Sequence, residues 1–131
     1  MPPQHFTLEE ATSLLPQLSD ILLAMQARKR DLDGLRQQLA EAAAQAAGNG
    51  HLVDRELAQK RTAVEEAASA LSDLVRQITD LGCELKGVDE GLVDFRAIRD
   101  GREVYLCWRL GEERIAFWHD LQEGFAGRQP L

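Results

Sequence analysis

Arg99-Asp100-Gly101-Arg102-Glu103-Val104-Tyr105-Leu106-Cys107-Trp108-Arg109-Leu110 is the stretch of sequence that decides the fold class. Its Asp-Gly dipeptide favours a two-residue hairpin turn, because both central positions of that turn take a positive φ. The residues that follow, 103–110, are rich in strand-forming side chains. Alternation along this strand places two sets of side chains on opposite faces: Tyr105, Cys107 and Arg109 on one, and Val104, Leu106 and Trp108 on the other. We expect the second set to pack in the core.

Further strands are predicted on both sides of this turn. Residues 83–86 are typical of a first strand, residues 92–95 of a second, irregular one, and residues 114–119 of the last, after a turn at Gly111-Glu112. We therefore expect three or four antiparallel strands. The tail, residues 124–131, contains too much glycine for regular structure, and we expect Phe125 to pin it to the rest of the protein.

A long helix is predicted before the sheet. Thr7-Leu8-Glu9-Glu10 forms a capping box, so the helix should begin at Leu8. Pro16 lacks an amide hydrogen and clashes with the preceding turn, which predicts a kink or break there. A heptad of apolar residues then predicts a helix that runs to about Ala47. Its members are Leu18, Met25, Leu32 and Leu39.

A second long helix follows a predicted turn at Gly48-Asn49-Gly50, with Asp54 as its N-cap and Gly82 as its C-terminal stop. The same heptad spacing recurs at Leu57, Val64, Leu71 and Ile78. Two helices of similar length joined by a short loop make an antiparallel hairpin. The predicted fold is therefore α+β, with a long antiparallel α-helical hairpin followed by a small antiparallel β-sheet. We expect a single domain over residues 1–131, with the hairpin at about 8–81 and the β unit and tail at about 82–131.

Composition excludes several classes of protein. The 131 residues are 44% hydrophobic and 28% charged, which is typical of a folded domain. The 15 basic and 22 acidic side chains leave a net charge of −7, so we expect no nucleic-acid partner. No apolar run is long enough to span a bilayer, and the N-terminus lacks the features of a signal peptide. We therefore expect a cytoplasmic protein with no membrane partner, in which Cys83 and Cys107 are reduced and buried.

Several apolar positions lie off the main heptad stripes: Leu14, Ile21, Leu23 and Val75. In a monomer they would face water, and a contiguous apolar strip of this kind usually marks an interface. We therefore expect a homodimer built through the helices. The alternative is that the sheet folds over this strip. The heptads also offer a surface to a different protein partner.

A set of short motifs runs through both halves of the chain. They are Phe6-Thr7-Leu8-Glu9-Glu10-Ala11, Gly91-Leu92-Val93-Asp94-Phe95, the stretch from Asp100 to Glu112, Ile115, Trp118-His119 and Gly124-Phe125-Ala126-Gly127-Arg128. In these motifs the chain resembles the bacterial domain-of-unknown-function family 2203 over nearly its whole length. It departs from the family at Arg96, where proline is common. The resemblance implies a small, cytoplasmic, bacterial, single-domain protein, and it implies no activity or substrate.

Metal binding is one candidate function. His, Asp and Glu side chains are ligands of iron, manganese and zinc, and several gather around the end of the last predicted strand. The candidate ligands are His119, Asp94, Glu10, Asp120 and Glu123. The alternative is a structural His119 that donates a hydrogen bond to a backbone carbonyl or to a carboxylate.

A pocket for a small anionic ligand is a second candidate. Arginine pairs bidentately with carboxylate or phosphate, and aromatic rings stack on planar ligands. The residues that would form this pocket on the sheet are Tyr105, Arg109, Trp118 and Arg128. The alternative is that the arginines pair with nearby carboxylates such as Glu103 and Glu112.

Nucleophilic catalysis has little support in the sequence. The serines lie on predicted helices, outside any nucleophile turn. Cys107 sits in the middle of a strand, and alternation is expected to point its thiol away from His119. We therefore expect a homodimeric binding or structural module rather than an enzyme, with the metal site and the anionic pocket as alternatives.

Overall fold

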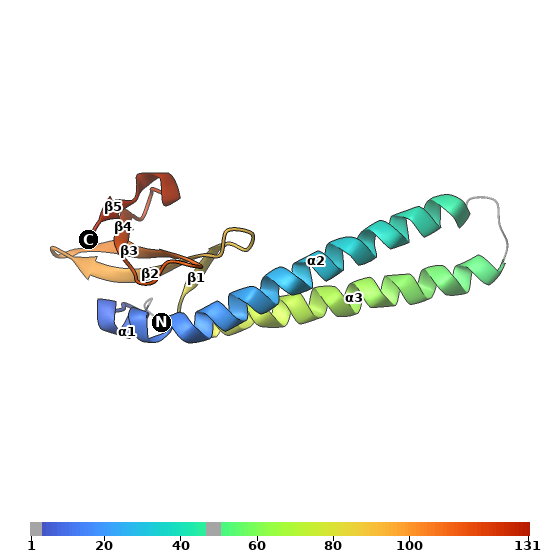
Figure 1. Cartoon of the computed structure of the whole chain (residues 1–131), viewed down its shortest axis with the longest axis horizontal. Helices are drawn as coiled ribbons and strands as arrows, with labels where there is room; N and C mark the ends of the chain where they lie inside the picture. Colours follow the sequence, from blue (N-terminus) through green and yellow to red (C-terminus); the bar gives the residue numbers. More distant parts are fainter. Residues whose placement is uncertain (1–3, 47–50) are drawn as a thin grey trace. The chain divides into compact units, whose positions relative to one another are not determined.

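The computed structural model describes residues 4–46 and 51–131, with residues 51–53 in their backbone only. Along this part of the chain three α-helices come first, and five strands with a short 3₁₀ helix follow (Figure 1). The helices are α1 (Leu8–Ser13), α2 (Leu15–Ala46) and α3 (His51–Asp80). The later elements are β1 (Glu84–Gly87), β2 (Leu92–Arg99), β3 (Arg102–Arg109), β4 (Phe117–Asp120), η1 (Phe125–Gly127) and β5 (Gln129–Pro130). The predicted α+β class is confirmed.

The first helix begins where its capping box predicts. The Thr7 hydroxyl accepts a hydrogen bond from the Glu10 N–H at 3.1 Å, and the Glu10 carboxylate accepts one from the Thr7 N–H at 2.9 Å. The predicted break lies at Leu14, ahead of Pro16. Pro16 falls in the first turn of α2, where its missing N–H would have no helical partner, so the break comes before the proline rather than at it.

The long helices differ from the prediction mainly at the start of α3. Because α3 begins at His51, Asp54 lies inside its first turn, and the prediction that Asp54 is the N-cap is wrong. An acidic side chain in the first turn interacts favourably with the helix dipole, so it resembles a cap in sequence. α3 ends at Asp80 and Gly82 follows with a φ of 89°, as a C-terminal stop requires. The predicted turn at Gly48-Asn49-Gly50 lies outside the described residues.

No described helix combines the length and the apolar character needed to cross a lipid bilayer.

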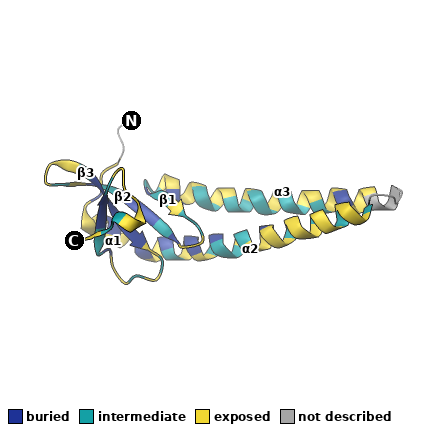
Figure 2. Cartoon of the chain, turned by 90° about the horizontal axis from the view of Figure 1, so that it is seen from above, coloured by how far each residue is buried: buried dark blue, intermediate teal, exposed yellow. Residues whose placement is uncertain are grey.

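Most of the buried residues belong to one of two compact units, Met1–Leu23 with Val75–Leu131. Figure 2 shows the buried residues of this unit gathered in the sheet and in the helix ends next to it. Phe6 packs edge-on against Phe95 with ring centroids 5.4 Å apart, and its N–H donates to the Arg96 carbonyl at 2.7 Å. The N-terminal segment is thereby fastened to β2.

The second compact unit, Ala24–Leu74, contains the remaining parts of α2 and α3. Both views show these parts side by side, and a groove of about 390 Å³ is lined by residues of each, among them Leu35 and Ala63 (Figures 1 and 2). Among its described side chains only three are buried: Met25, Leu32 and Leu57. The prediction of a single domain stays a prediction.

The apolar positions off the heptad stripes are less exposed than the sequence predicts. Ile21 is buried, Leu14 and Val75 are half-buried, and only Leu23 is strongly exposed, at 57%. The expected continuous water-facing strip is therefore reduced to Leu23.

The sheet has five antiparallel strands in chain order, so the prediction of three or four strands is too low. The extra strand is β5, in the tail that was expected to lack regular structure. Trp118 pairs with Gln129, and the Leu131 N–H donates to the Ala116 carbonyl at 3.0 Å. The glycines of the tail permit the turn at η1 that brings the chain back along β4. Phe125 is 42% exposed and its ring centre lies 4.5 Å from the Arg128 guanidinium, so its role in pinning the tail stays a prediction.

The β2–β3 hairpin forms as predicted. Asp100 and Gly101 take φ values of 52° and 81°, and Arg99 pairs with Arg102 across the two-residue turn. The strand ends differ from the prediction. β1 and β3 are shifted by one position, β2 continues to Arg99 beyond the predicted end, and β4 begins at Phe117 because residues 114–116 are not in a strand.

Candidate metal centre

One face of the sheet carries buried polar side chains. Asp94 pairs directly with Cys107 across β2 and β3, and Tyr105 pairs with His119 across β3 and β4. Directly paired residues share a face, and so do residues two apart on one strand. The apolar Leu106 and its partner Trp118 therefore lie on the opposite face, in agreement with the predicted alternation.

Asp94, Cys107 and His119 form a compact and buried cluster. One ligand atom from each lies within 4.8 Å of the other two. The residues are 3%, 2% and 1% exposed, respectively. The expectation that the Cys107 thiol points away from His119 is therefore wrong. The two residues sit diagonally across paired strands on the same face.

The hydrogen bonds of His119 define where protons sit in this cluster. Its Nδ1 lies 2.9 Å from the Asp120 backbone carbonyl, which can only accept, so Nδ1 carries a hydrogen. Its Nε2 lies 3.0 Å from Asp94 Oδ2. This second bond also needs one proton, carried either by the imidazole or by the carboxyl group. Nε2 and Oδ2 are both metal-ligand atoms, and a metal ion can take the place of that proton.

Burial disfavours the charged forms of the two acidic groups in the cluster. Burial raises the pKa of Asp94, although the neighbouring His119 opposes this. Burial also raises the pKa of Cys107 to about 11, with a further increase from Asp94 and an opposing effect of Arg128. A protonated thiol is a poor nucleophile, so the arrangement does not favour Cys107 as a catalytic nucleophile. A bound cation would favour both deprotonated forms.

A cavity of about 400 Å³ adjoins the cluster. It is lined by all three cluster residues and, among others, by Glu123 and Phe125 from the segment after β4. Lys86, which also lines it, donates to Glu84 at 3.3 Å. The residues that follow β4 therefore border the side of the cluster on which this cavity lies.

The other predicted ligands lie in different places. Glu10 is exposed and engaged in the capping box of α1. The Asp120 carboxylate pairs with Arg102 at 2.7 Å, and only its backbone carbonyl contacts His119. Glu123 is exposed and lines the adjoining cavity. Of the five predicted ligands, the described structure thus brings Asp94 and His119 into the cluster.

Cys107 is the cluster residue that the metal prediction omitted. A signal for it was present in the sequence, because a two-residue turn at Asp100-Gly101 sets the register of the whole hairpin. Counting outward from that turn places Asp94 opposite Cys107, as the structure has it. The position of His119 depends on a longer connection, so no such count was available for β4.

The four residues of the predicted anionic pocket do not meet. Trp118 lies on the face opposite Tyr105, and the Tyr105 hydroxyl donates to Glu84 at 2.9 Å. Arg128 is engaged in a bidentate ion pair with Glu112, as the alternative interpretation of the arginines expects. Arg109 is exposed, with its guanidinium 5.9 Å from the Phe125 ring.

A model of the family described as "Uncharacterized conserved protein (DUF2203)" matches residues 4–131. No curated protein and no solved structure matches the chain.

Proposed function

We propose that this chain, which belongs to the DUF2203 family of uncharacterised conserved proteins, binds one transition-metal ion through Asp94, Cys107 and His119. The observation that carries the proposal is the convergence of three ligand atoms of different chemistry within 4.8 Å, in a buried position. Burying an acidic or imidazole group costs free energy unless the group has a polar partner, and one metal ion can act as the partner of all three side chains.

The ligand set favours zinc among the three metals that the sequence suggests. A thiolate is a soft ligand that selects against manganese, and one sulfur, one nitrogen and one oxygen suit Zn²⁺ well. Three protein ligands leave one position of a tetrahedral ion open. The adjoining cavity supports the view that this position takes water or a small molecule, with the Glu123 carboxylate nearby.

Elemental analysis tests the proposal. Untagged wild-type protein, purified without chelator, should contain about one zinc ion per chain, as a three-ligand protein site would hold. The variants Cys107→Ser and His119→Ala should lose about 90% or more of the bound zinc. Removing a residue that only orients a ligand already weakens metal binding about ten-fold or more, and removing the ligand itself should weaken it at least as much. Cys83→Ser is the matched control, since Cys83 is the second buried free cysteine and lies outside the cluster.

Reconstitution with Co²⁺ provides an independent measurement of the cysteine ligand. A thiolate bound to Co²⁺ gives an intense charge-transfer absorption, which we expect in wild type and Cys83→Ser and not in Cys107→Ser. Far-ultraviolet circular dichroism confirms that each variant is folded. The proposal is refuted if the wild type neither retains metal nor takes up Zn²⁺ or Co²⁺, or if Cys107→Ser binds both ions like the wild type.

We also propose that α2 and α3 form an antiparallel hairpin that pairs with a second copy of the chain. The supporting observation is the thin core of the unit Ala24–Leu74, whose buried described residues are few for its length. Its further heptad residues Leu39, Val64 and Leu71 are only half-buried, and Leu23 beside the unit is exposed. A second copy would cover these apolar positions, because a two-fold dimer packs the same surface of each chain against the other.

Light scattering across a concentration series tests the dimer. We expect twice the mass of one chain at micromolar concentration, and the mass of one chain for a Leu39→Glu/Leu71→Glu variant that remains helical. A monomeric wild type refutes the dimer. A wild-type monomer whose mass increases only when another protein is added would favour the predicted protein partner instead.

A reducing compartment, the cytoplasm, is part of the same proposal. Cys83 and Cys107 are both free and buried, and free thiols are usual in proteins of reducing compartments. Burial raises the pKa of Cys83 to about 12, so this thiol is protonated and unreactive.

A further inference from the structure

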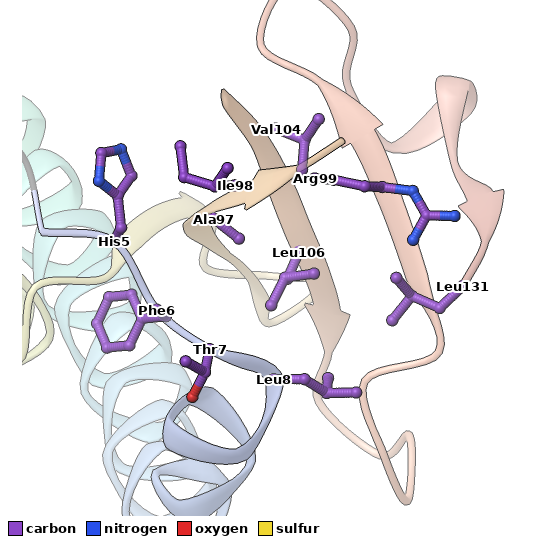
Figure 3. A pocket seen from close by; sticks show the side chains of 10 residues that line it. All are labelled: His5, Phe6, Thr7, Leu8, Ala97, Ile98, Arg99, Val104, Leu106 and Leu131. Atoms are coloured by element: carbon purple, nitrogen blue, oxygen red, sulfur yellow. The ribbon is translucent and has the colours of Figure 1, made fainter. Parts of the chain in front are cut away.

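A second cavity, of about 480 Å³, lies on the opposite face of the sheet from the candidate metal centre. Val104 and Leu106 line it, and strand alternation puts both on the face opposite Cys107. Figure 3 shows it between the N-terminal segment on one side and the ends of β2 and β3 on the other. Its volume is within the range of roughly 300–1,000 Å³ that small-molecule sites occupy.

The path of the chain explains why this space is not filled. Phe6 packs on Phe95, and its backbone N–H is hydrogen-bonded to β2, so it covers this part of the sheet face. The next residue, Thr7, is the N-cap of α1, and the chain turns there into the helix. Two residues beyond Phe95 on the same face of β2 lies Ala97, whose methyl group is too small to fill the space beside it.

Exposed apolar side chains surround the cavity. Leu8 is 46% exposed, Ile98 54% and Leu131 44%. These are three of the six large hydrophobic side chains that are exposed among the described residues, and all three border this one cavity. The side chains of Leu8 and Leu131 can contact a ligand there, whereas alternation turns the Ile98 side chain toward the face of Asp94. A concentration of this kind marks a binding surface, whereas scattered single leucines need no explanation.

Among the described residues, one cation at the cavity has no acidic partner. Arg99 lines the cavity, half-buried, and its guanidinium lies 4.9 Å from the centre of the Trp118 ring. Within residues 4–46 and 51–131 no carboxylate lies within the 4.0 Å of an ion pair with it. The chain has more acidic than basic side chains, and two neighbouring cations are paired. Arg102 lies 2.7 Å from Asp120, and His5 lies 2.7 Å from Glu103. Arg99 is therefore the group available to an acidic ligand.

We propose that this cavity binds an amphipathic anion, with its apolar chain among Leu8, Leu106 and Leu131 and its acidic group at Arg99. A guanidinium pairs bidentately with either a carboxylate or a phosphate, so a fatty acid and an alkyl phosphate share the required chemistry. The site is independent of the metal centre, because it uses no cluster residue and lies on the other face.

Titration of the full chain with octanoate, octyl phosphate and octanol, followed by isothermal calorimetry and amide NMR shifts, tests this proposal. We expect at least one of the two anions to bind saturably, with shifts confined to the cavity. Arg99→Gln should weaken the binding of that anion about ten-fold and leave octanol unchanged, since it removes one charge-assisted contact. Arg109→Gln is the matched control, an exposed arginine outside the cavity.

The apolar part of the proposal has its own variants. Leu8→Ser should weaken the binding of the anion and of octanol alike, and Leu121→Ser, at an exposed leucine elsewhere, should change neither. Both substituted side chains are exposed, so the variants should fold. Binding of one anion but not the other identifies the acidic group. Absence of binding by both anions, equal binding by wild type and Arg99→Gln, or shifts that map away from the cavity would overturn the proposal.

Discussion

Arg128→Met tests how the C-terminal tail is held against the sheet. The Arg128 guanidinium donates to the two Glu112 carboxylate oxygens at 2.9 and 2.6 Å and to the Cys107 carbonyl at 3.2 Å. It also lies 4.3 and 4.5 Å from the ring centres of Phe117 and Phe125. The side chains of Arg128 and Glu112 are only 11% and 26% exposed, so water screens the ion pair weakly.

The magnitude follows from these contacts. Methionine keeps much of the aliphatic length and removes the charge, which leaves the Glu112 carboxylate half-buried without its main partner. Hydrogen bonds to charged groups contribute about 1.5–3 kcal/mol in total at such a site, and the cation–π contacts about 1 kcal/mol more. The cost of burying the guanidinium opposes this, and among the described residues its buried Nε has no hydrogen-bond partner. We expect a net loss of about 2–3 kcal/mol in the free energy of unfolding.

Urea unfolding, followed by tryptophan fluorescence, measures this loss. Glu112→Gln and the double variant complete a thermodynamic cycle, in which we expect a coupling energy of about 1 kcal/mol or more. Arg114→Met is the control at an exposed arginine, with an expected change of under about 0.5 kcal/mol. An Arg128→Met variant no less stable than Arg114→Met, or a coupling energy near zero, would show that the ion pair does not hold the tail.

The same ion pair has a defined pH dependence. Burial raises the pKa of Glu112, but the hydrogen bonds from Arg128 and from the Arg109 N–H outweigh it and hold the pKa below its ordinary value of 4.5. The stabilisation is therefore fully present above pH 4.5 and is lost as the pH falls through the folded-state value. The difference between wild type and Arg128→Met should narrow below pH 4.5. A difference that widens there would contradict the assignment.

Substitutions at four further positions have distinct expected costs in urea unfolding. Gly91→Ala should cost about 2–4 kcal/mol and Gly101→Ala only about 1 kcal/mol. Both have a positive φ, but a Cβ at Gly91 would meet Leu110 at 2.5 Å and one at Gly101 meets open space; equal costs would contradict this account. Thr7→Ala should cost about 1 kcal/mol and Thr7→Ser much less, because serine keeps the capping hydroxyl; the helical circular dichroism signal should follow the same order. Phe95→Ala should cost about 3–5 kcal/mol, because the ring is fully buried, and a value under 1 kcal/mol would mean that the site collapses or is more hydrated than described.

Signals confined to a few neighbouring residues predicted the structure well. The capping box at Thr7, the hairpin turn at Asp100-Gly101 and the stop at Gly82 each depend on backbone chemistry within one turn, and each appears as expected. Alternation along β3 was equally local, and it separated the buried polar face from the apolar one correctly.

Features that depend on distant partners were predicted poorly. Whether Gln129 and Pro130 form a strand depends on the free edge of β4, and no local pattern reveals such an edge. The position of His119 depended on the register of β4 against β3, which no local pattern sets, whereas the pairing of Asp94 with Cys107 could have been counted from the turn at Asp100-Gly101. The exposure of Ile21 was overestimated because the heptads do not describe what packs beside them.

The alternation of the two faces also makes the candidate ligand cluster a sensor of correct folding. Asp94, Cys107 and His119 come from three consecutive strands, and each pairing is set by one register. A slip of a single residue in β3 would turn Cys107 toward the hydrophobic interior and bring Leu106 to the polar face. Such a misfolded chain would keep its strand content while losing the cluster altogether. Metal uptake during refolding would then report not the amount of sheet formed but whether its strands are aligned.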